Sequence, residues 1–412
     1  MAAISKRRAF LRAGLQAGVA ASAGKVLPAS ATETNNPKWM NGPGQPFAAY
    51  GQPAPQESHV IRRVGLNYRG IDDNGAAWCP LEQLQGSITP NGLHFVRNHA
   101  GTPAIQPEQH RLYIHGEVHR PLQFSVSNLL RYPQVSRQLF IECGGNSSAG
   151  WSEYPVQRTA GLTHGLMSAS EWTGVPVRLL LEEAGVQASA QWVVATGNDS
   201  GAFDMSIPLE KIMDDCIIAL YQNGERLRPE NGYPMRLLVP GWKGVLSVKW
   251  LGGLQLSSQP AMSRNETAHY TEILPSGLSR QFTTTMAVKS LITSPSHGMT
   301  LAGPGVQEIT GLAWSGHGKI ARVEVSTDGG QSWADAELCE PPRPMALTRF
   351  RTSWKWDGED HILQSRATDE RGHVQPTRQA LVAERGDKGF YHYNAIVSWE
   401  VNSFGLVSHV YV

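Results

Sequence analysis

The chain has 412 residues, and its 36 Lys and Arg side chains nearly balance its 35 Asp and Glu, which gives a formal net charge of +1. This balance argues against nucleic acid or an anionic membrane surface as the main partner. The length predicts two or three domains. Charged residues make up only 17% of the chain, whereas glycine (42) and proline (26) are plentiful, which favours short strands joined by ordered loops.

The first 31 residues are typical of a twin-arginine export signal. Arg7 and Arg8 precede a weakly apolar stretch at 13–24, and Ala29-Ser30-Ala31 matches the small-residue pattern of a cleavage site. The stretch is too short to span a bilayer; a disordered basic tail is the alternative. Because this route exports folded proteins, we expect a periplasmic protein that acquires a cofactor before export, without a membrane span.

Residues 32–60, rich in proline, glycine and asparagine, predict an extended arm. Strand and helix patterns are then mixed from 61 to 285. Residues 112–118 alternate as in a strand, and residues 177–184 predict an amphipathic helix that ends at Gly185. Asn223-Gly224 predicts a hairpin turn.

From 286 to 412 the sequence shows strand patterns and turns alone. Residues 321–326 alternate, and the turn residues Asp328-Gly329-Gly330 follow them. The size and pattern predict an immunoglobulin-like β-sandwich. The predicted fold class is therefore α+β, with a mixed α/β domain over 61–285 followed by this sandwich.

Four cysteines occur: Cys79, Cys143, Cys216 and Cys339. They are too few for a disulfide scaffold. Cys216 begins an apolar run and is expected in the core, and a pairing of Cys79 with Cys339 stays open. The sequence has no Cys-x-x-Cys-His motif for haem, so we expect any electrons to leave through a partner.

Cys143 follows a short predicted strand that contains Leu139-Phe140-Ile141, and the turn residues Gly144-Gly145-Asn146 come directly after it. Glycines at this place let the backbone bend tightly and let a bulky group approach the sulfur, as a metal or a substrate requires. A buried cysteine that ends a core strand is one alternative. A cysteine nucleophile with His164 as its base is another.

Four segments place cations beside glycines or hydrogen-bonding side chains, and they contain Arg97, Arg236, Lys243 and Lys249. Such cations suit a phosphate group, the arginines by their bidentate geometry. Neither a Walker loop nor a G-x-G-x-x-G motif is present, so the phosphate need not belong to a nucleotide. Taken alone, each segment is more typical of a solvated surface.

The order of the motifs between about residues 90 and 400 resembles the sulfite oxidase family of molybdenum enzymes. The motifs are Arg97-Asn98-His99, Cys143-Gly144-Gly145-Asn146, Gly165–Ser168, Trp172–Val175, Ser206–Leu209, Gly232–Arg236, Lys249-Trp250-Leu251, Ala313–Gly316 and Ser326–Gly330. The residues around Cys143, together with Lys289-Ser290, are most similar to the sulfane dehydrogenase (SoxC type) branch, which belongs to bacterial thiosulfate oxidation.

This resemblance implies a molybdenum-molybdopterin cofactor, one per chain, with Cys143 as the protein ligand; a soft thiolate suits that metal. The domain at 61–285 would bind the molybdopterin, and the domain at 286–412 would form a dimer. The implied catalytic residues are Arg97, Tyr270 and Arg385. The residues implied to contact the cofactor are Arg97, Asn98, His99, Asp199, Asn231, Arg236, Ser247 and Lys249.

Several of these residues also have a structural interpretation. Tyr270 could be an amphipathic core tyrosine, and Arg385 could form a salt bridge between domains. Asp199 could cap a turn, and Arg236 could be a buried structural arginine. At Asn231 many members of the family carry a histidine.

The resemblance implies oxidation of a sulfur substrate by oxygen transfer, with electrons passed to a c-type cytochrome subunit. This chain has Ser148 where sulfite-oxidising members carry an arginine, five positions after Cys143. Loss of that cation weakens attraction for free sulfite, so we expect a sulfane sulfur on a carrier protein as the substrate. Direct sulfite oxidation and a cofactor-free periplasmic scaffold are the alternatives. The expected assembly is a homodimer of this chain within a heterotetramer with the cytochrome.

Overall fold

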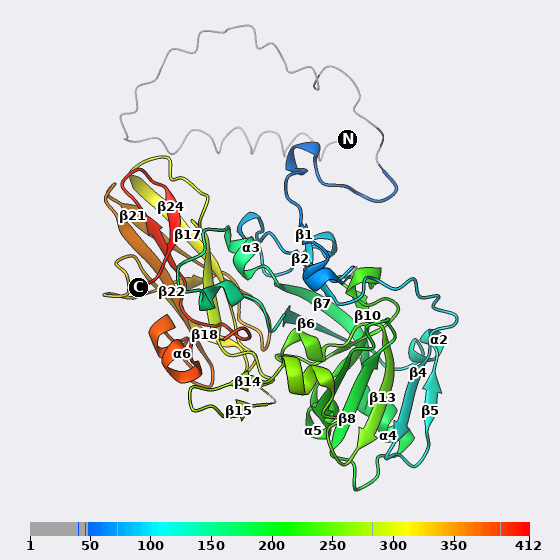
Figure 1. Cartoon of the computed structure of the whole chain (residues 1–412). Helices are drawn as coiled ribbons and strands as arrows, with labels where there is room; N and C mark the ends of the chain where they lie inside the picture. The colour runs from blue at the N-terminus through cyan, green and yellow to red at the C-terminus, as the bar shows by residue number, and fades with distance from the viewer. Residues whose placement is uncertain (1–39, 41–45, 47, 72, 282, 388) are drawn as a thin grey trace, which may run out of the picture. The chain divides into compact units, whose positions relative to one another are not determined.

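The computed structural model describes residues 40, 46, 48–71, 73–281, 283–387 and 389–412 (Figure 1). The predicted export signal and most of residues 32–47 lie outside this description. The chain divides into two compact units, residues 1–57 and 58–412. The sheets and the longer helices described below all belong to the second unit.

Three sheets form the first part of this unit. The first is antiparallel, in the order β1 (Arg63–Gly65), β2 (Gly75–Trp78), β3 (Val96–Asn98). The second has the order β11 (Glu225–Arg226), β10 (Ile217–Gln222), β7 (Met167–Pro176), β6 (Val135–Glu142), and β12 (Arg236–Leu238) also pairs with β10. The third has the order β5 (Leu122–Phe124), β4 (Leu112–Gly116), β13 (Leu251–Ser257), β8 (Trp192–Gly197), β9 (Asp204–Pro208).

Short helices connect these strands: α2 (Val126–Leu129), α3 (Ala160–His164), α4 (Val177–Ala184) and α5 (Leu209–Asp214). The predicted helix at 177–184 is confirmed as α4, which buries Val177, Leu180, Leu181 and Ala184 and ends at Gly185 with a positive φ of 72°. The strand predicted at 112–118 is confirmed over Leu112–Gly116 as β4, which ends where Gly116 has a positive φ of 89°. The Asn223-Gly224 hairpin joins β10 to β11.

A short hairpin of β14 (Glu272–Ile273) and β15 (Ser279–Arg280) precedes the C-terminal part. That part contains two antiparallel sheets, coloured yellow to red in Figure 1, and β16 of one contacts β22 of the other. The first sheet has the order β16 (Lys289–Ser294), β17 (Gly305–Trp314), β21 (Thr348–Trp356), β20 (Glu337–Leu338). The second has the order β19 (Ala334–Asp335), β18 (Ile320–Ser326), β22 (His361–Asp369), β23 (Ser398–Val401), β24 (Val407–Val410). The immunoglobulin-like topology stays a prediction.

The expectation of strands alone after residue 286 was wrong at α6 (Arg378–Arg385). The Thr377 hydroxyl caps its first turn by accepting from the Ala380 amide at 3.2 Å. Leu381 is the buried residue of this amphipathic helix, but its apolar run at 380–383 is short, and so short a run does not distinguish a helix from a strand.

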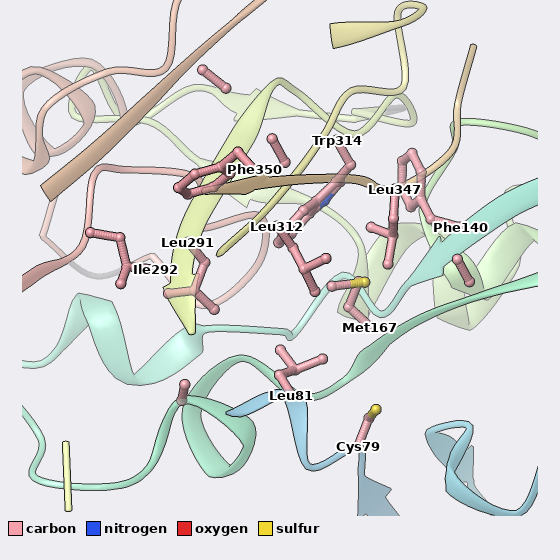
Figure 2. Packing of buried hydrophobic residues seen from close by; sticks show 14 of the residues in the cluster. Cys79, Leu81, Phe140, Met167, Leu291, Ile292, Leu312, Trp314, Leu347 and Phe350 are labelled. Carbon is pink, nitrogen blue, oxygen red and sulfur yellow. The ribbon is translucent and has the colours of Figure 1, made fainter. Parts of the chain in front are cut away.

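One hydrophobic core joins the first part of the unit to the C-terminal part. Figure 2 shows Phe140 and Met167, from β6 and β7, in the same cluster as Trp314 and Phe350, from β17 and β21. All four side chains are 3% exposed or less. The end of β6 is therefore packed from both sides, and this end delivers the predicted metal ligand.

All four cysteines are free: Cys79 and Cys216 are buried, and Cys339 is exposed. The prediction that Cys216 lies in the core is confirmed. Among the residues that the structure describes, no helix is long and apolar enough to cross a lipid bilayer.

Candidate functional site

One cavity, with about 730 Å³ of empty space, brings together most of the predicted site residues. Its walls come from β3, the end of β6, the turn after β8, and the chain between β12 and β13. The predicted residues that line it are Arg97, Asn98, His99, Cys143, Asp199, Asn231, Arg236, Ser247, Lys249 and Tyr270.

Cys143 directly follows β6, whose register with β7 runs to the pair Glu142–Met167. The Cys143 amide donates to the Leu166 carbonyl at 2.9 Å, and its own carbonyl accepts from the Asn146 amide at 2.9 Å. Burial raises the pKa of the thiol, while a hydrogen bond from the Gly145 backbone and the charge of Arg97 act in the opposite direction. A cation or a metal beside this sulfur would therefore favour the thiolate.

Arg236, on β12, is a buried arginine that points into the cavity. Its guanidinium donates to the Asn231 carbonyl at 2.9 Å and to the Ser247 carbonyl at 2.8 Å, and its Nε has no partner among the described atoms. Burial lowers its pKa to about 9, so it still carries a positive charge at neutral pH.

Lys249 lies next to Arg236 and shares its surroundings. Its ammonium donates to the Arg97 and Glu230 carbonyls, at 3.1 Å each, and to the side chain of Asn98. Burial, followed by the charge of Arg236, lowers its pKa well below the usual value. Keeping this lysine charged while it is buried costs free energy. The site is therefore suited to a negative group that would offset this cost.

We call Arg97, Arg236 and Lys249 the cavity cations. In the part of the chain that the structure describes, none of the three makes a salt bridge to a carboxylate. Arg97 donates to the Asn74 side chain at 2.7 Å and to the Gly75 carbonyl at 3.2 Å. With the unpartnered Arg236 Nε and the buried Asp199 Oδ1, which also has no partner, the cavity offers the charges and free polar atoms that a molybdopterin phosphate and pterin need.

The remaining predicted contacts have different surroundings. His99 stacks on Phe203, with ring centroids 4.8 Å apart. The Asn231 amide donates to Gln222 at 2.9 Å, and the Ser247 hydroxyl accepts from the Val239 amide at 3.1 Å. Asn231 and Ser247 are therefore held by the protein itself, and they position Arg236 through their carbonyls.

Tyr270 follows the helical turn Asn265–His269, and its ring lies 4.8 Å from the ring of Tyr391. Burial, and then the neighbouring Cys143 and Tyr391, raise its pKa well above the usual value. Its phenol therefore stays protonated and can donate a hydrogen bond.

Arg385 lies beside this region, outside the lining of the cavity. It ends α6, pairs with the Glu272 carboxylate, and donates to the His392 carbonyl at 2.6 Å. Glu272 also lies 3.5 Å from the ammonium of Lys243. This Glu272 cluster (Glu272, Lys243 and Arg385) matches the salt bridge that was the structural interpretation of Arg385, whose catalytic role stays a prediction.

Sequence reasoning missed Glu272, Phe203 and Tyr391. A Cβ built on Gly144 would lie 3.4 Å from Tyr391 and 3.5 Å from Tyr270, so the glycine leaves room for two aromatic rings. The run of aromatic residues at 390–393 was a usable signal, but nothing in the local sequence shows that it folds back onto residue 144. His164, the candidate base, is buried and bonds the Ser147 hydroxyl at 2.7 Å.

Comparisons with known proteins show the family of this chain. A family model for the oxidoreductase molybdopterin binding domain matches residues 99–265, and one for the Mo-co oxidoreductase dimerisation domain matches residues 280–398. The crystal structure of the sulfane dehydrogenase SoxCD from Paracoccus pantotrophus is similar with a TM-score of 0.89 and 41% identity, over 92% of this chain and 98% of that chain.

Two curated relatives extend beyond this chain. Mitochondrial sulfite oxidase of Rattus norvegicus is 31% identical over 356 residues, which cover 80% of this chain and 64% of that protein. NADH nitrate reductase of Solanum lycopersicum is 30% identical over 347 residues, 73% of this chain and 37% of that protein. The chain thus spans between about a third and two thirds of these relatives. It belongs to the sulfite oxidase family of molybdopterin oxidoreductases, and its cofactor is the molybdenum cofactor.

Proposed function

We propose that this chain is the catalytic subunit of a periplasmic sulfane dehydrogenase, which oxidises a sulfur atom bound to a carrier protein and passes electrons to a c-type cytochrome. The 41% identical structure is named a sulfane dehydrogenase, which supports the substrate class. The observation that carries the proposal is the Glu272 cluster: one carboxylate pairs with both Lys243 and Arg385. Together with the serine at position 148, it reduces the free positive charge near Tyr270 that would attract a free dianion, although Arg97, without a salt bridge among the described residues, remains there.

The residues of the cavity would have different roles in this reaction. The molybdenum cofactor, when bound, supplies oxygen transfer and accepts two electrons. Cys143 would hold its metal, and the cavity cations would bind its phosphate. Tyr270, protonated because of its burial, would donate a hydrogen bond to the oxygen that gains negative charge.

Aromatic side chains would limit the access of water to the sulfur. The rings of Phe203 and Tyr391 both pack against Tyr270, with ring centroids 6.4 Å and 4.8 Å away. Lower polarity at this place strengthens the hydrogen bond that Tyr270 donates. It also suits a substrate that arrives on a hydrocarbon arm better than a fully hydrated anion.

We also propose that this chain is exported to the periplasm and assembles with a second copy of itself and with cytochrome subunits. The twin-arginine pattern at 1–31 supports a periplasmic location. The match to a dimerisation domain at 280–398 supports a homodimer of this chain, and joining of the cytochrome subunits would complete a heterotetramer.

Direct oxidation of free sulfite is the competing function, and the 31% identity to a mitochondrial sulfite oxidase favours it. The other alternative was a cofactor-free periplasmic scaffold. The molybdenum cofactor of the family argues against it.

Steady-state kinetics of the loaded protein test the proposal. We expect rapid reduction of a c-type cytochrome with a carrier protein that bears a cysteine persulfide, and at least about tenfold lower kcat/KM with free sulfite, the tenfold being about 1.4 kcal/mol of transition-state stabilisation. Equal kcat/KM for the two substrates would contradict it. Cys143→Ser is the control for the metal: molybdenum content, measured by mass spectrometry, should be lost together with activity.

A further inference from the structure

The turn that carries Cys143 is held by two side chains from the C-terminal domain. Lys289 begins β16 and Trp314 ends β17, and the register pairs them directly across the two strands. Both reach Glu142, the residue before Cys143. The Lys289 ammonium lies 3.1 Å from Glu142 Oε1, and the Trp314 indole donates to Oε2 at 2.7 Å.

Lys289 also holds the other end of the turn. Its ammonium donates to the Ser147 hydroxyl at 2.6 Å. The Asn146 amide group donates to Glu142 Oε1 at 2.9 Å, and its oxygen accepts from the Leu166 amide at 3.0 Å. One ammonium therefore contacts both residues that flank the segment 143–146, and this segment has no freedom to shift without breaking one of these contacts.

The burial of this group points to a role in geometry. The side chains of Lys289 and Glu142 are only 1% and 2% exposed, and both oxygens of the carboxylate are occupied. An apolar pair of similar volume is often as stable as a buried ion pair, so the benefit of such a pair lies in directional contacts. Here those contacts fix the backbone on both sides of one sulfur atom.

We propose that Lys289 is a positioning residue for Cys143: with Trp314 and Glu142 it sets the place of the sulfur in the cavity, so the C-terminal domain takes part in building the metal site. The inference rests on Cys143 being the metal ligand, which is part of the proposed function, but it does not depend on the identity of the sulfur substrate.

Thiol reactivity in the cofactor-free protein tests this proposal without any turnover. The full chain is produced in cells that do not make molybdopterin, and exposed Cys339 is replaced by serine so that Cys143 is the most accessible thiol; Cys79 and Cys216 are buried. We expect Lys289→Met to increase the rate of iodoacetamide modification of Cys143 by about tenfold, because the released turn opens locally. Peptide mass spectrometry measures the rate.

The matched control is Arg349→Met. Arg349 is another buried cation of the C-terminal domain, and it donates to the Leu84 and Gly86 carbonyls at 3.1 and 2.9 Å. The control thus removes a contact between the two parts of the unit that does not involve the Cys143 turn. Its modification rate should stay within about twofold of the parent, even where its thermal stability falls.

A second measurement uses the loaded protein. The electron paramagnetic resonance spectrum of its Mo(V) state should change in Lys289→Met and stay unchanged in Arg349→Met, since this signal reports the geometry of the thiolate ligand. Where Lys289→Met does not fold, Trp314→Phe decides, because it removes the indole hydrogen bond to Glu142 and keeps an aromatic ring in the core; we expect about threefold faster modification.

A folded variant with the modification rate and the spectrum of the parent would show that the pair serves stability alone and would overturn the proposal. A parent protein that binds no molybdenum would contradict the proposed function instead, while the modification rates would still decide the positioning of Cys143.

Discussion

The cavity cations and the Glu272 cluster lie in the same region but treat positive charge in opposite ways. Arg236 and Lys249 donate to carbonyl and amide oxygens, without a salt bridge among the described residues, and burial lowers the pKa of both. Lys243 and Arg385, in contrast, share one carboxylate. Burying a cation without a salt bridge costs free energy, which an anion from outside the chain would offset. The comparison therefore distinguishes a site whose buried cations suit a permanently bound anion from a site where one carboxylate of the chain offsets part of the positive charge of two cations.

The largest effect should come from removing a cavity cation. Arg236→Met should lower the molybdenum content of the purified protein by at least about tenfold, because a charged hydrogen bond to a phosphate contributes about 1.5–3 kcal/mol. Mass spectrometry of the metal measures this. Arg349→Met, which removes a buried arginine elsewhere, should keep its metal; equal loss in both variants would remove the distinction between the two regions.

Removing the carboxylate that Lys243 and Arg385 share tests the Glu272 cluster. Glu272→Gln leaves Lys243 and Arg385 without a negative partner beside Tyr270. We expect the KM for free sulfite to fall about five- to tenfold at low salt and the difference to shrink at high salt, as screening reduces the attraction. Steady-state kinetics with a cytochrome acceptor measure the change. Glu337→Gln, at an exposed pair with Arg351, should leave the KM unchanged.

Ser148→Arg should have a smaller effect in the same direction. It restores the cation that sulfite-oxidising members carry at this position, but residue 148 is half-buried, so the added charge is partly screened. We expect the KM for sulfite to fall about threefold. Ser148→Gln adds similar bulk without charge and is the control. An equal change in both would point to shape in place of charge.

The smallest effect is a dependence of cofactor retention on pH. A bound phosphate favours the charged form of Lys249, so binding raises its lowered pKa and takes up a proton. Retention should therefore fall as the pH rises toward the usual lysine value of about 10.4. We expect about twofold less molybdenum after gel filtration at pH 9.5 than at pH 7.5. The dependence should disappear in the fraction of Lys249→Met that retains metal.

The sequence was informative where chemistry is local. Cys143 was a candidate because a strand, a cysteine and two glycines are consecutive. The cavity cations, whose segments taken alone were more typical of a solvated surface, were assigned through the order of the family's motifs. The Glu272 cluster could not be found in this way, since Arg385 is more than a hundred positions from its partner. The same holds for Lys289 and Glu142, which are 147 positions apart. Contacts between distant elements depend on how two sheets pack, and no local pattern encodes that.

The common core of Phe140, Met167, Trp314 and Phe350 has a consequence for biosynthesis. A ribosome releases residue 143 long before residue 314, so a nascent chain holds the future metal ligand on an incompletely packed strand. We expect that loading waits until synthesis is complete. A fragment that stops before residue 286 would expose half of an apolar interface and become a substrate for proteases rather than a smaller enzyme.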